Sequence, residues 1–246
     1  MPLFKLKDNK LFKLKDRIID LEKDVQSITE HNLNEIFGLK FIQNEFIIQN
    51  FRIDTIAFDE NTKSFVIIEY KKDKNISVID QAVAYLSVML NNKAEFVLLY
   101  QEKVGKNLQR DKVDWSQSRI ILIADSFTNY QENAIGFKDL PIELYEVKFY
   151  EDNLISYTPI KSSIKKLATL RSIKQTKDVQ ETLKEIKEYT LEDHFKEDWQ
   201  LSRRIFNKLK GEILVIGGIT EKITKFYIAY IKEDSNKSFF VIVVQK

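Results

Sequence analysis

The chain has 246 residues, 43% of them hydrophobic and 31% charged, as in a soluble globular protein with one large domain or one medium and one small domain. The absence of cysteine excludes disulfides and thiolate chemistry, and two histidines argue against a zinc site. The net charge of +2 identifies no partner, and no apolar run reaches the roughly 18 residues of a membrane span. The first ten residues lack a signal-peptide core, so we expect a cytoplasmic protein.

The first 38 residues predict a hairpin followed by a helix. Residues 3–17, LFKLKDNKLFKLKDR, contain the stretch LFKLK twice, which is typical of a β-hairpin with a short polar turn. Residues 19–37 have apolar side chains at helical spacing, and Gly38 suits the C-terminal cap of that helix. Glu30 lies at the flank of the apolar stripe.

The middle of the chain alternates strand and helix patterns. Ser77 and Asp80 form a capping-box pattern, and the apolar stretch that follows predicts a buried helix. Strands are predicted at 45–51, 51–58, 64–72, 95–100, 119–124 and 142–150, with a turn at 59–63 and a short helix or loop at 127–137.

The last third of the chain predicts a linker and a second unit. Residues 161–177 contain six lysines or arginines and no acid, which fits a solvated linker or helix face, with phosphate contact as the alternative. Helix patterns and then a strand pair predict a small α+β unit at 190–246. We therefore divide the chain into a core at 1–160, a basic linker or helix at 161–189 and a C-terminal domain at 190–246.

Two acidic residues on neighbouring strands are predicted to meet. Because side chains alternate along a strand, Glu69 and Lys71 at the end of VIIEYKK lie on one face. If the preceding turn is centred on Asn61 and Thr62, Asp54 falls opposite Glu69, whereas a slip of one residue would break this pairing.

Two carboxylates at directly opposite positions of neighbouring strands repel each other, and burying both requires a positive charge between them. Lys71 is one candidate for that charge, and a divalent cation such as Mg²⁺, which prefers oxygen ligands, is the other. Strands often end in charged residues, so a solvated strand end remains the alternative for Glu69 and Lys71.

The helix that follows carries a second polar pair. Gln81 and Tyr85 lie four residues apart and therefore share a helix face. A glutamine within an apolar helix needs a hydrogen-bond partner, and both side chains can face the strand ends. The alternative is a glutamine at the exposed rim and a tyrosine in the core.

The pattern D-x(14)-E-x-K followed by Q-x(3)-Y, in the order helix–strand–strand–strand–helix–strand, resembles the PD-(D/E)xK nuclease superfamily and its RecB-like branch. Most of the chain looks like an uncharacterised prokaryotic family placed there, with a small C-terminal domain of unknown function. The resemblance implies an α/β fold: a restriction-endonuclease-like αβββαβ core with a mixed central sheet flanked by helices. A β-hairpin would precede this core, and a small α+β domain would follow it.

The resemblance also implies roles for individual residues. Asp54 and Glu69 match the metal-ligating acids, the backbone carbonyl of Tyr70 matches a further ligand, and Lys71 matches the catalytic lysine. The implied cofactor is Mg²⁺, with Mn²⁺ as the alternative.

Three further positions match the superfamily pattern. Glu30 matches an acid of the first helix that touches the metal or its water, and Gln81 and Tyr85 match the Q-x(3)-Y motif. One departure is that Ile53, instead of proline, precedes Asp54.

From the residues and the resemblance together we expect a Mg²⁺-dependent deoxyribonuclease that hydrolyses DNA phosphodiester bonds and does not bind membranes. The alternative is a catalytically inactive nucleic-acid-binding or protein-interaction module on the same fold. A homodimer or a partner protein would use the C-terminal domain.

Overall fold

The computed structural model describes residues 3–17, 22–71, 78–135, 140–161, 189–196, 198–232 and 238–244. Its helices are α1 (Glu22–His31), α2 (Leu33–Phe37), α3 (Val78–Asn91), α4 (Lys93–Val104), α5 (Asn129–Ala134), α7 (Leu191–His194) and α8 (Gln200–Leu214). Its strands are β1 (Phe4–Lys7), β2 (Lys10–Lys13), β3 (Asp16–Arg17), β4 (Lys40–Ile48), β5 (Phe51–Asp59), β6 (Ser64–Lys71), β7 (Arg119–Ala124), β8 (Ile142–Tyr150), β9 (Ile155–Ile160), β10 (Ile219–Ile223), β11 (Ile228–Lys232) and β12 (Ser238–Ile242). None of the described helices is both long and apolar enough to cross a membrane.

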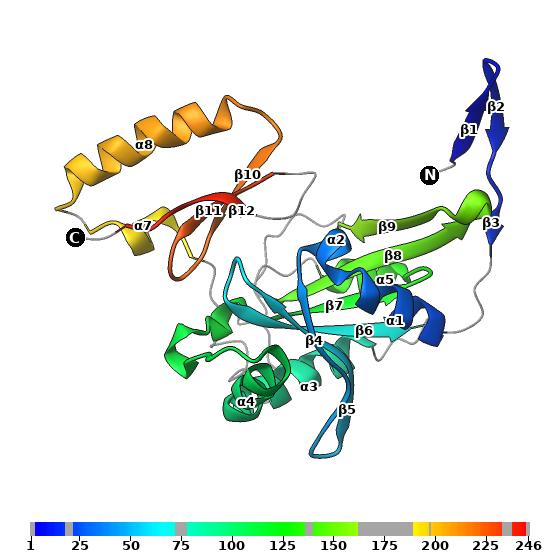
Figure 1. Ribbon diagram of the computed structural model, residues 1–246, viewed down its shortest axis with the longest axis horizontal. Coiled ribbons are helices and arrows are strands. Elements are labelled where there is room, and N and C mark those ends of the chain that lie inside the picture. Colours follow the sequence, from blue (N-terminus) through cyan, green and yellow to red (C-terminus); the bar gives the residue numbers. More distant parts are fainter. Residues whose placement is uncertain are drawn as a thin grey trace.

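A seven-stranded mixed sheet lies at the centre of the molecule (Figure 1). Its strands run in the order β3-β8-β7-β6-β5-β4, and β9 pairs with β8. Strands β4, β5 and β6 are antiparallel, whereas β6, β7 and β8 are parallel. One apolar cluster packs the sheet against α3 and α4, and a second packs the opposite face against α1 and α2. The expected α/β class with helices on both faces of a mixed sheet is therefore confirmed.

The register predicted for the hairpin that β5 and β6 form is confirmed. Thr55 pairs with Ile68 and Asp59 pairs with Ser64, so the pairing continues toward Asp54 opposite Glu69. The predicted N-terminal hairpin is also present as β1 and β2, and the strands predicted at 119–124 and 142–150 are β7 and β8.

The strand predicted at 95–100 is wrong, because these residues belong to helix α4. Its buried side chains, Phe96, Val97, Leu99 and Tyr100, follow a helical spacing and pack on the sheet. A short apolar run of this kind fits either a buried strand or a buried helix, and periodicity alone does not distinguish them.

Two boundaries also differ from the prediction. The helix expected at 19–37 is two helices, since Asn32 interrupts it and its side chain bonds the carbonyl of Ile28 at 2.8 Å. The strand expected at 45–51 is β4, which ends before a turn at 49–50. Strands β3, β9 and β10 were not predicted, and the predicted helix start at Ser77 lies outside the described residues.

The C-terminal residues form their own three-stranded sheet, β10-β11-β12, beside α8, as expected for an α+β unit (Figure 1). Phe195, Phe206, Ile213, Ile228 and Tyr230 form its buried cluster. The predicted linker at 161–189, including the basic run, lies almost entirely outside the described residues, so the domain boundaries stay a prediction.

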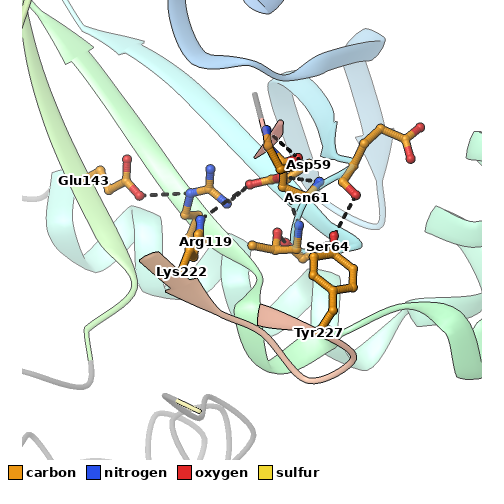
Figure 2. A network of polar contacts seen from close by, with 10 residues as sticks. Asp59, Asn61, Ser64, Arg119, Glu143, Lys222 and Tyr227 are labelled. Atoms are coloured by element: carbon orange, nitrogen blue, oxygen red, sulfur yellow. Dashed lines mark hydrogen bonds and ion pairs between the residues drawn. The ribbon is translucent and has the colours of Figure 1, made fainter. Parts of the chain in front are cut away.

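The C-terminal unit is fastened to the turn between β5 and β6 (Figure 2). Asp59, at the end of β5, lies 3.0 Å from Nη1 of Arg119 and 3.8 Å from Nζ of Lys222, which comes from β10. The hydroxyl of Tyr227 donates to the carbonyl of Glu60 at 3.1 Å. These contacts join a C-terminal strand and loop to the far end of the hairpin that carries Asp54 and Glu69.

The buried Asp59 is therefore the acid that both basic side chains of this contact approach. Burial alone would raise the pKa of Asp59, but the charges of Arg119 and Lys222 and the amides of Thr62 and Asn61 hold it below its ordinary value. A lowered pKa means that Asp59 contributes stability above pH 3.8, and that the contribution is lost as the pH falls through the folded-state value.

We predict that Asp59→Asn lowers the free energy of unfolding at pH 7 by about 3 kcal/mol, because the largely buried Arg119 loses its more buried acidic partner and keeps the partly exposed Glu143. The difference from the wild type should shrink as the pH falls below 3.8 toward the lowered folded-state pKa of Asp59. Urea unfolding at several pH values measures this, with the exposed Asp111→Asn as the matched control. A difference that is the same at pH 3 and pH 7 would contradict the assigned role.

Candidate metal-binding and catalytic site

Two acidic side chains from β5 and β6 meet near the ends of these strands. Glu69 is buried, with 3% of its side chain exposed, and Asp54 is half-buried. The backbone N–H of Tyr70 donates to Oδ2 of Asp54 at 3.2 Å, which draws the Asp54 carboxylate across to β6. The meeting of Asp54 and Glu69 inferred from the turn is thus present in the structure.

Lys71 completes the group. Its Nζ lies 2.8 Å from Oε1 of Glu69, and 25% of its side chain is exposed. Oε2 of Glu69 is buried and, among the residues that the structure describes, receives no N–H or O–H group from a donor side chain or amide, although the carboxyl group of Asp54 is close enough to share a proton with Glu69. The lysine therefore satisfies one of the two oxygens of Glu69, and the second oxygen remains available to a further positive group.

The pKa values of these side chains reflect two carboxylates, Asp54 and Glu69, beside a single ammonium group, that of Lys71. Burial, together with the charge of Asp54, raises the pKa of Glu69 to about 7, although Lys71 acts in the opposite direction. Burial also raises the pKa of Asp54, against the Tyr70 amide and the charge of Lys71. Burial alone would lower the pKa of Lys71, but its hydrogen bond to Glu69 outweighs this and raises it.

This donor set suits a hard divalent cation. Mg²⁺ takes oxygen ligands and is commonly held by one or two carboxylates, with the remaining positions filled by water or phosphate. The free oxygen of Glu69 and the carboxylate of Asp54 offer such ligands. Among the described residues, no group of three or more histidine, cysteine, aspartate or glutamate side chains is placed to hold a metal. A site here would accordingly use two carboxylates, as expected, and the Tyr70 carbonyl stays a predicted third ligand.

Glu30 lies apart from Glu69 and Lys71. It accepts hydrogen bonds from Thr55 Oγ1 at 2.5 Å and from Asn44 Nδ2 at 3.1 Å. Thr55 follows Asp54 on the strand and so faces the opposite side of the sheet. Gln26 links this cluster to Asp54, because it donates both to Glu30 Oε1 and to the backbone carbonyl of Asp54. The role of Glu30 at a metal stays a prediction.

Gln81 and Tyr85 lie beside the acidic pair. Gln81 Nε2 donates to the hydroxyl of Tyr85 at 2.9 Å, and that hydroxyl donates to the carbonyl of Arg52 at 2.9 Å. Burial raises the pKa of Tyr85, and the charge of Glu69 raises it further. The predicted i, i+4 pair thus forms one chain of hydrogen bonds that reaches β5 two residues before Asp54.

A cavity of about 380 Å³ opens at the ends of β6, β7 and β8, with Lys71 in its wall. Its lining also includes Asp125 and Ser126, which were not identified from the sequence. Lys71 pairs with Ala124 in the parallel β6–β7 ladder, so the two residues after Ala124 lie at the same edge of the sheet. Recognising 119–124 as a parallel neighbour of 64–71 would have pointed to them.

No family model matches the chain. A protein of Haemophilus influenzae described as an uncharacterized protein is 41% identical over 238 residues, which cover 96% of this chain and 78% of that protein. Solved structures give weaker likenesses. A repair endonuclease from Pyrococcus abyssi is 19% identical over 54% of this chain and 50% of its own, with a TM-score of 0.33.

EndoMS, solved in complex with double-stranded DNA, is 20% identical over 55% of this chain and 50% of its own, with a TM-score of 0.34. SfsA from Pyrococcus furiosus, solved with Ca²⁺, is 12% identical over 63% of this chain and 78% of its own, with a TM-score of 0.31. This chain therefore spans about half the length of the two endonucleases. With all three TM-scores below 0.5, the functional argument depends on the side chains of the site itself.

The raised pKa of Glu69 makes a prediction about stability without metal. Between pH 4.5 and about 7 the folded chain holds a proton that the unfolded chain releases, so the free energy of unfolding falls as the pH rises through this window. Glu69→Gln removes this loss of unfolding free energy, because a glutamine side chain does not titrate. In EDTA at pH 8 we expect Glu69→Gln to be more stable than the wild type by roughly 1–3 kcal/mol, with a smaller difference at pH 5.

Urea unfolding at pH 5 and pH 8 tests this expectation, and Glu102→Gln, an exposed acid on α4, is the matched control. If the wild type and Glu69→Gln have the same dependence on pH, the carboxylates do not compete as described.

Proposed function

The chain belongs to one family with the uncharacterized Haemophilus influenzae protein, and for this chain we propose a metal-dependent nuclease that hydrolyses DNA phosphodiester bonds. A single observation carries the proposal. Two carboxylates from adjacent strands converge, one of their oxygens is buried without a hydrogen-bond donor among the described residues, and an ammonium group lies 2.8 Å from the other oxygen of the same acid. Of these three side chains Lys71 lines the cavity, whereas Asp54 and Glu69 do not. A carboxylate with a pKa as strongly raised as that of Glu69 is typical of catalytic sites.

Asp54 and Glu69 would hold the metal, with the Tyr70 carbonyl as a further ligand. A bound Mg²⁺, or Mn²⁺ in its place, would supply positive charge and Lewis acidity to the phosphodiester. The buried oxygen of Glu69 supports this assignment, because a buried carboxylate oxygen without a donor is costly unless a cation satisfies it.

Lys71 would act on the reacting groups. Its ammonium group is held by Glu69 at one side, and its partial exposure leaves the remaining N–H groups free to face the cavity. In that position it can orient the attacking water and offset the negative charge that develops on the phosphate oxygens. The hydrogen bond to Glu69 raises the pKa of Lys71, so in the metal-free protein Lys71 is protonated at neutral pH and acts as a donor and a positive charge.

The remaining predicted residues would support this arrangement. The hydrogen bonds of Gln81 and Tyr85 to the carbonyl of Arg52 fix α3 against the strand that carries Asp54. Glu30 would act through Gln26, which holds the backbone carbonyl of Asp54. We therefore treat all three as positioning residues.

We predict that Asp54→Asn and Lys71→Met each reduce Mg²⁺-dependent cleavage of duplex DNA by roughly 100-fold or more, while the far-ultraviolet circular dichroism spectrum is unchanged. Cleavage of an end-labelled duplex and of a supercoiled plasmid measures this. Asp80→Asn and Lys103→Met, exposed residues on α3 and α4, are controls of the same charge change and should cleave like the wild type.

Cleavage at the wild-type rate by either site variant would discard these assignments. Salt-dependent DNA binding without cleavage in Mg²⁺ or Mn²⁺ would favour a nucleic-acid-binding protein without catalysis.

Metal binding gives a separate prediction. A ligand that binds only the folded state stabilises it, so saturating Mn²⁺ should raise the melting temperature of the wild type by roughly 5 °C. Asp54→Asn and Glu69→Gln should lose most of this rise, whereas Glu102→Gln should keep it. An equal rise in all four proteins would place the ion elsewhere.

A further inference from the structure

We propose that the β1–β2 hairpin is a DNA-binding arm, which contacts the phosphate backbone of duplex DNA through Lys7 and Lys10 while the substrate occupies the cavity beside Lys71. This inference rests on the proposed function, since both require a nucleic-acid substrate. It adds a binding surface that lies outside the catalytic group.

The first observation is the exposure of the hairpin. All eight residues of β1 and β2 are exposed, and the two strands form a sheet of their own, separate from the central one. The hairpin projects from the body of the molecule beyond β3 (Figure 1). The tip is a tight turn in which Asp8 and Asn9 both have positive φ, as type I′ turns require. The hairpin is thus a regular element whose two strands are exposed along their whole length.

The second observation is how its charges are sorted. Lys5 pairs with Phe12 and Lys7 pairs with Lys10, and residues that pair directly share a face. Three lysines and one aromatic ring therefore lie on one side of a two-stranded ribbon. Residues 3–17 contain six basic and two acidic residues, a net charge of +4, whereas the whole chain has only +2. The partner that this face fits is a polyanion.

The third observation is where the hairpin is anchored. Its root is fixed to the end of β8, because Nζ of Lys5 lies 2.6 Å from Oδ2 of Asp152 and the N–H of Glu151 donates to the carbonyl of Lys15 at 3.1 Å. Strand β3 follows at once, and its Asp16 and Arg17 line the same cavity as Lys71. A polyanion at the cavity therefore passes the root of the hairpin.

The dimensions and chemistry favour duplex DNA as this polyanion. A two-stranded β-ribbon fits the major groove, and four residues of strand extend roughly 14 Å. Since Lys5 is already paired with Asp152, Lys7 and Lys10 near the tip are the lysines of this face that are left to contact phosphates. The opposite face carries Phe4, Leu6, Leu11 and Lys13. Its three apolar side chains could instead pair with a second copy of the chain, so the test includes that outcome.

The test compares Lys7→Gln/Lys10→Gln with Lys112→Gln/Lys208→Gln, which removes two exposed lysines from other parts of the full chain. Binding to a fluorescent 30-base-pair duplex is measured in EDTA, so that no cleavage occurs, at several KCl concentrations. Each lost phosphate contact lowers the slope of log K against log salt by about 0.9. We expect the hairpin variant to lose about 2 units of slope and to bind roughly tenfold more weakly at 0.15 M salt, and the control to match the wild type.

Three results would overturn the inference: no binding of the duplex by the wild type, an unchanged slope in the hairpin variant, or an equal loss of slope in the control. A dimer that becomes monomeric in Leu6→Thr/Leu11→Thr, together with an unchanged slope, would assign the hairpin to self-association. Because the assay needs no hydrolysis, its failure is separate from failure of the proposed function. A wild type that binds through the hairpin but never cleaves would remove only the nuclease assignment.

Discussion

The register of the β5–β6 hairpin is the constraint on which the candidate site depends. Asp59 accepts the backbone N–H groups of Asn61 and Thr62, and this turn sets the pairing of every residue along both strands. A slip of one residue would turn Asp54 or Glu69 to the other face of the sheet. The chemistry at one end of the hairpin is therefore determined by hydrogen bonds at the other end. The C-terminal unit binds at that same turn, through Lys222 and Tyr227.

The second constraint is electrostatic. On the face of the sheet that Glu69 occupies, β6 contributes Phe65 and Ile67 to an apolar cluster, so two carboxylates there lose most of their hydration. Lys71 compensates for part of this loss, but it has one charge for two acids. The pKa of about 7 at Glu69 expresses the part that is not compensated. A divalent cation would supply the missing charge with the ligand type that it prefers.

The sequence predicted the parts of the site that depend on short-range regularities. The alternation of side chains and one turn placed Asp54 against Glu69, and the spacing of four residues joined Gln81 to Tyr85. Parts that depend on long-range packing were not accessible. Asn44 and Thr55 donate hydrogen bonds to Glu30 only because β4 pairs with β5 past a bulge. No local sequence pattern encodes that contact. Asp125 and Ser126 could be identified only by knowing that β7 is the parallel neighbour of β6. Because residues 95–100 of α4 were predicted to be a strand, this pairing was not recognised from the sequence.

The buried Glu69 oxygen, which has no donor among the residues that the structure describes, also bears on how selection acts on this position. At most buried positions, random substitutions lower stability, and selection for folding alone removes them. At Glu69 we expect the reverse direction, because burial and the charge of Asp54 disfavour the ionised acid in the metal-free fold. If that expectation holds, selection for a stable fold alone would not favour an acid at this position, and a carboxylate kept here would be kept for its chemistry.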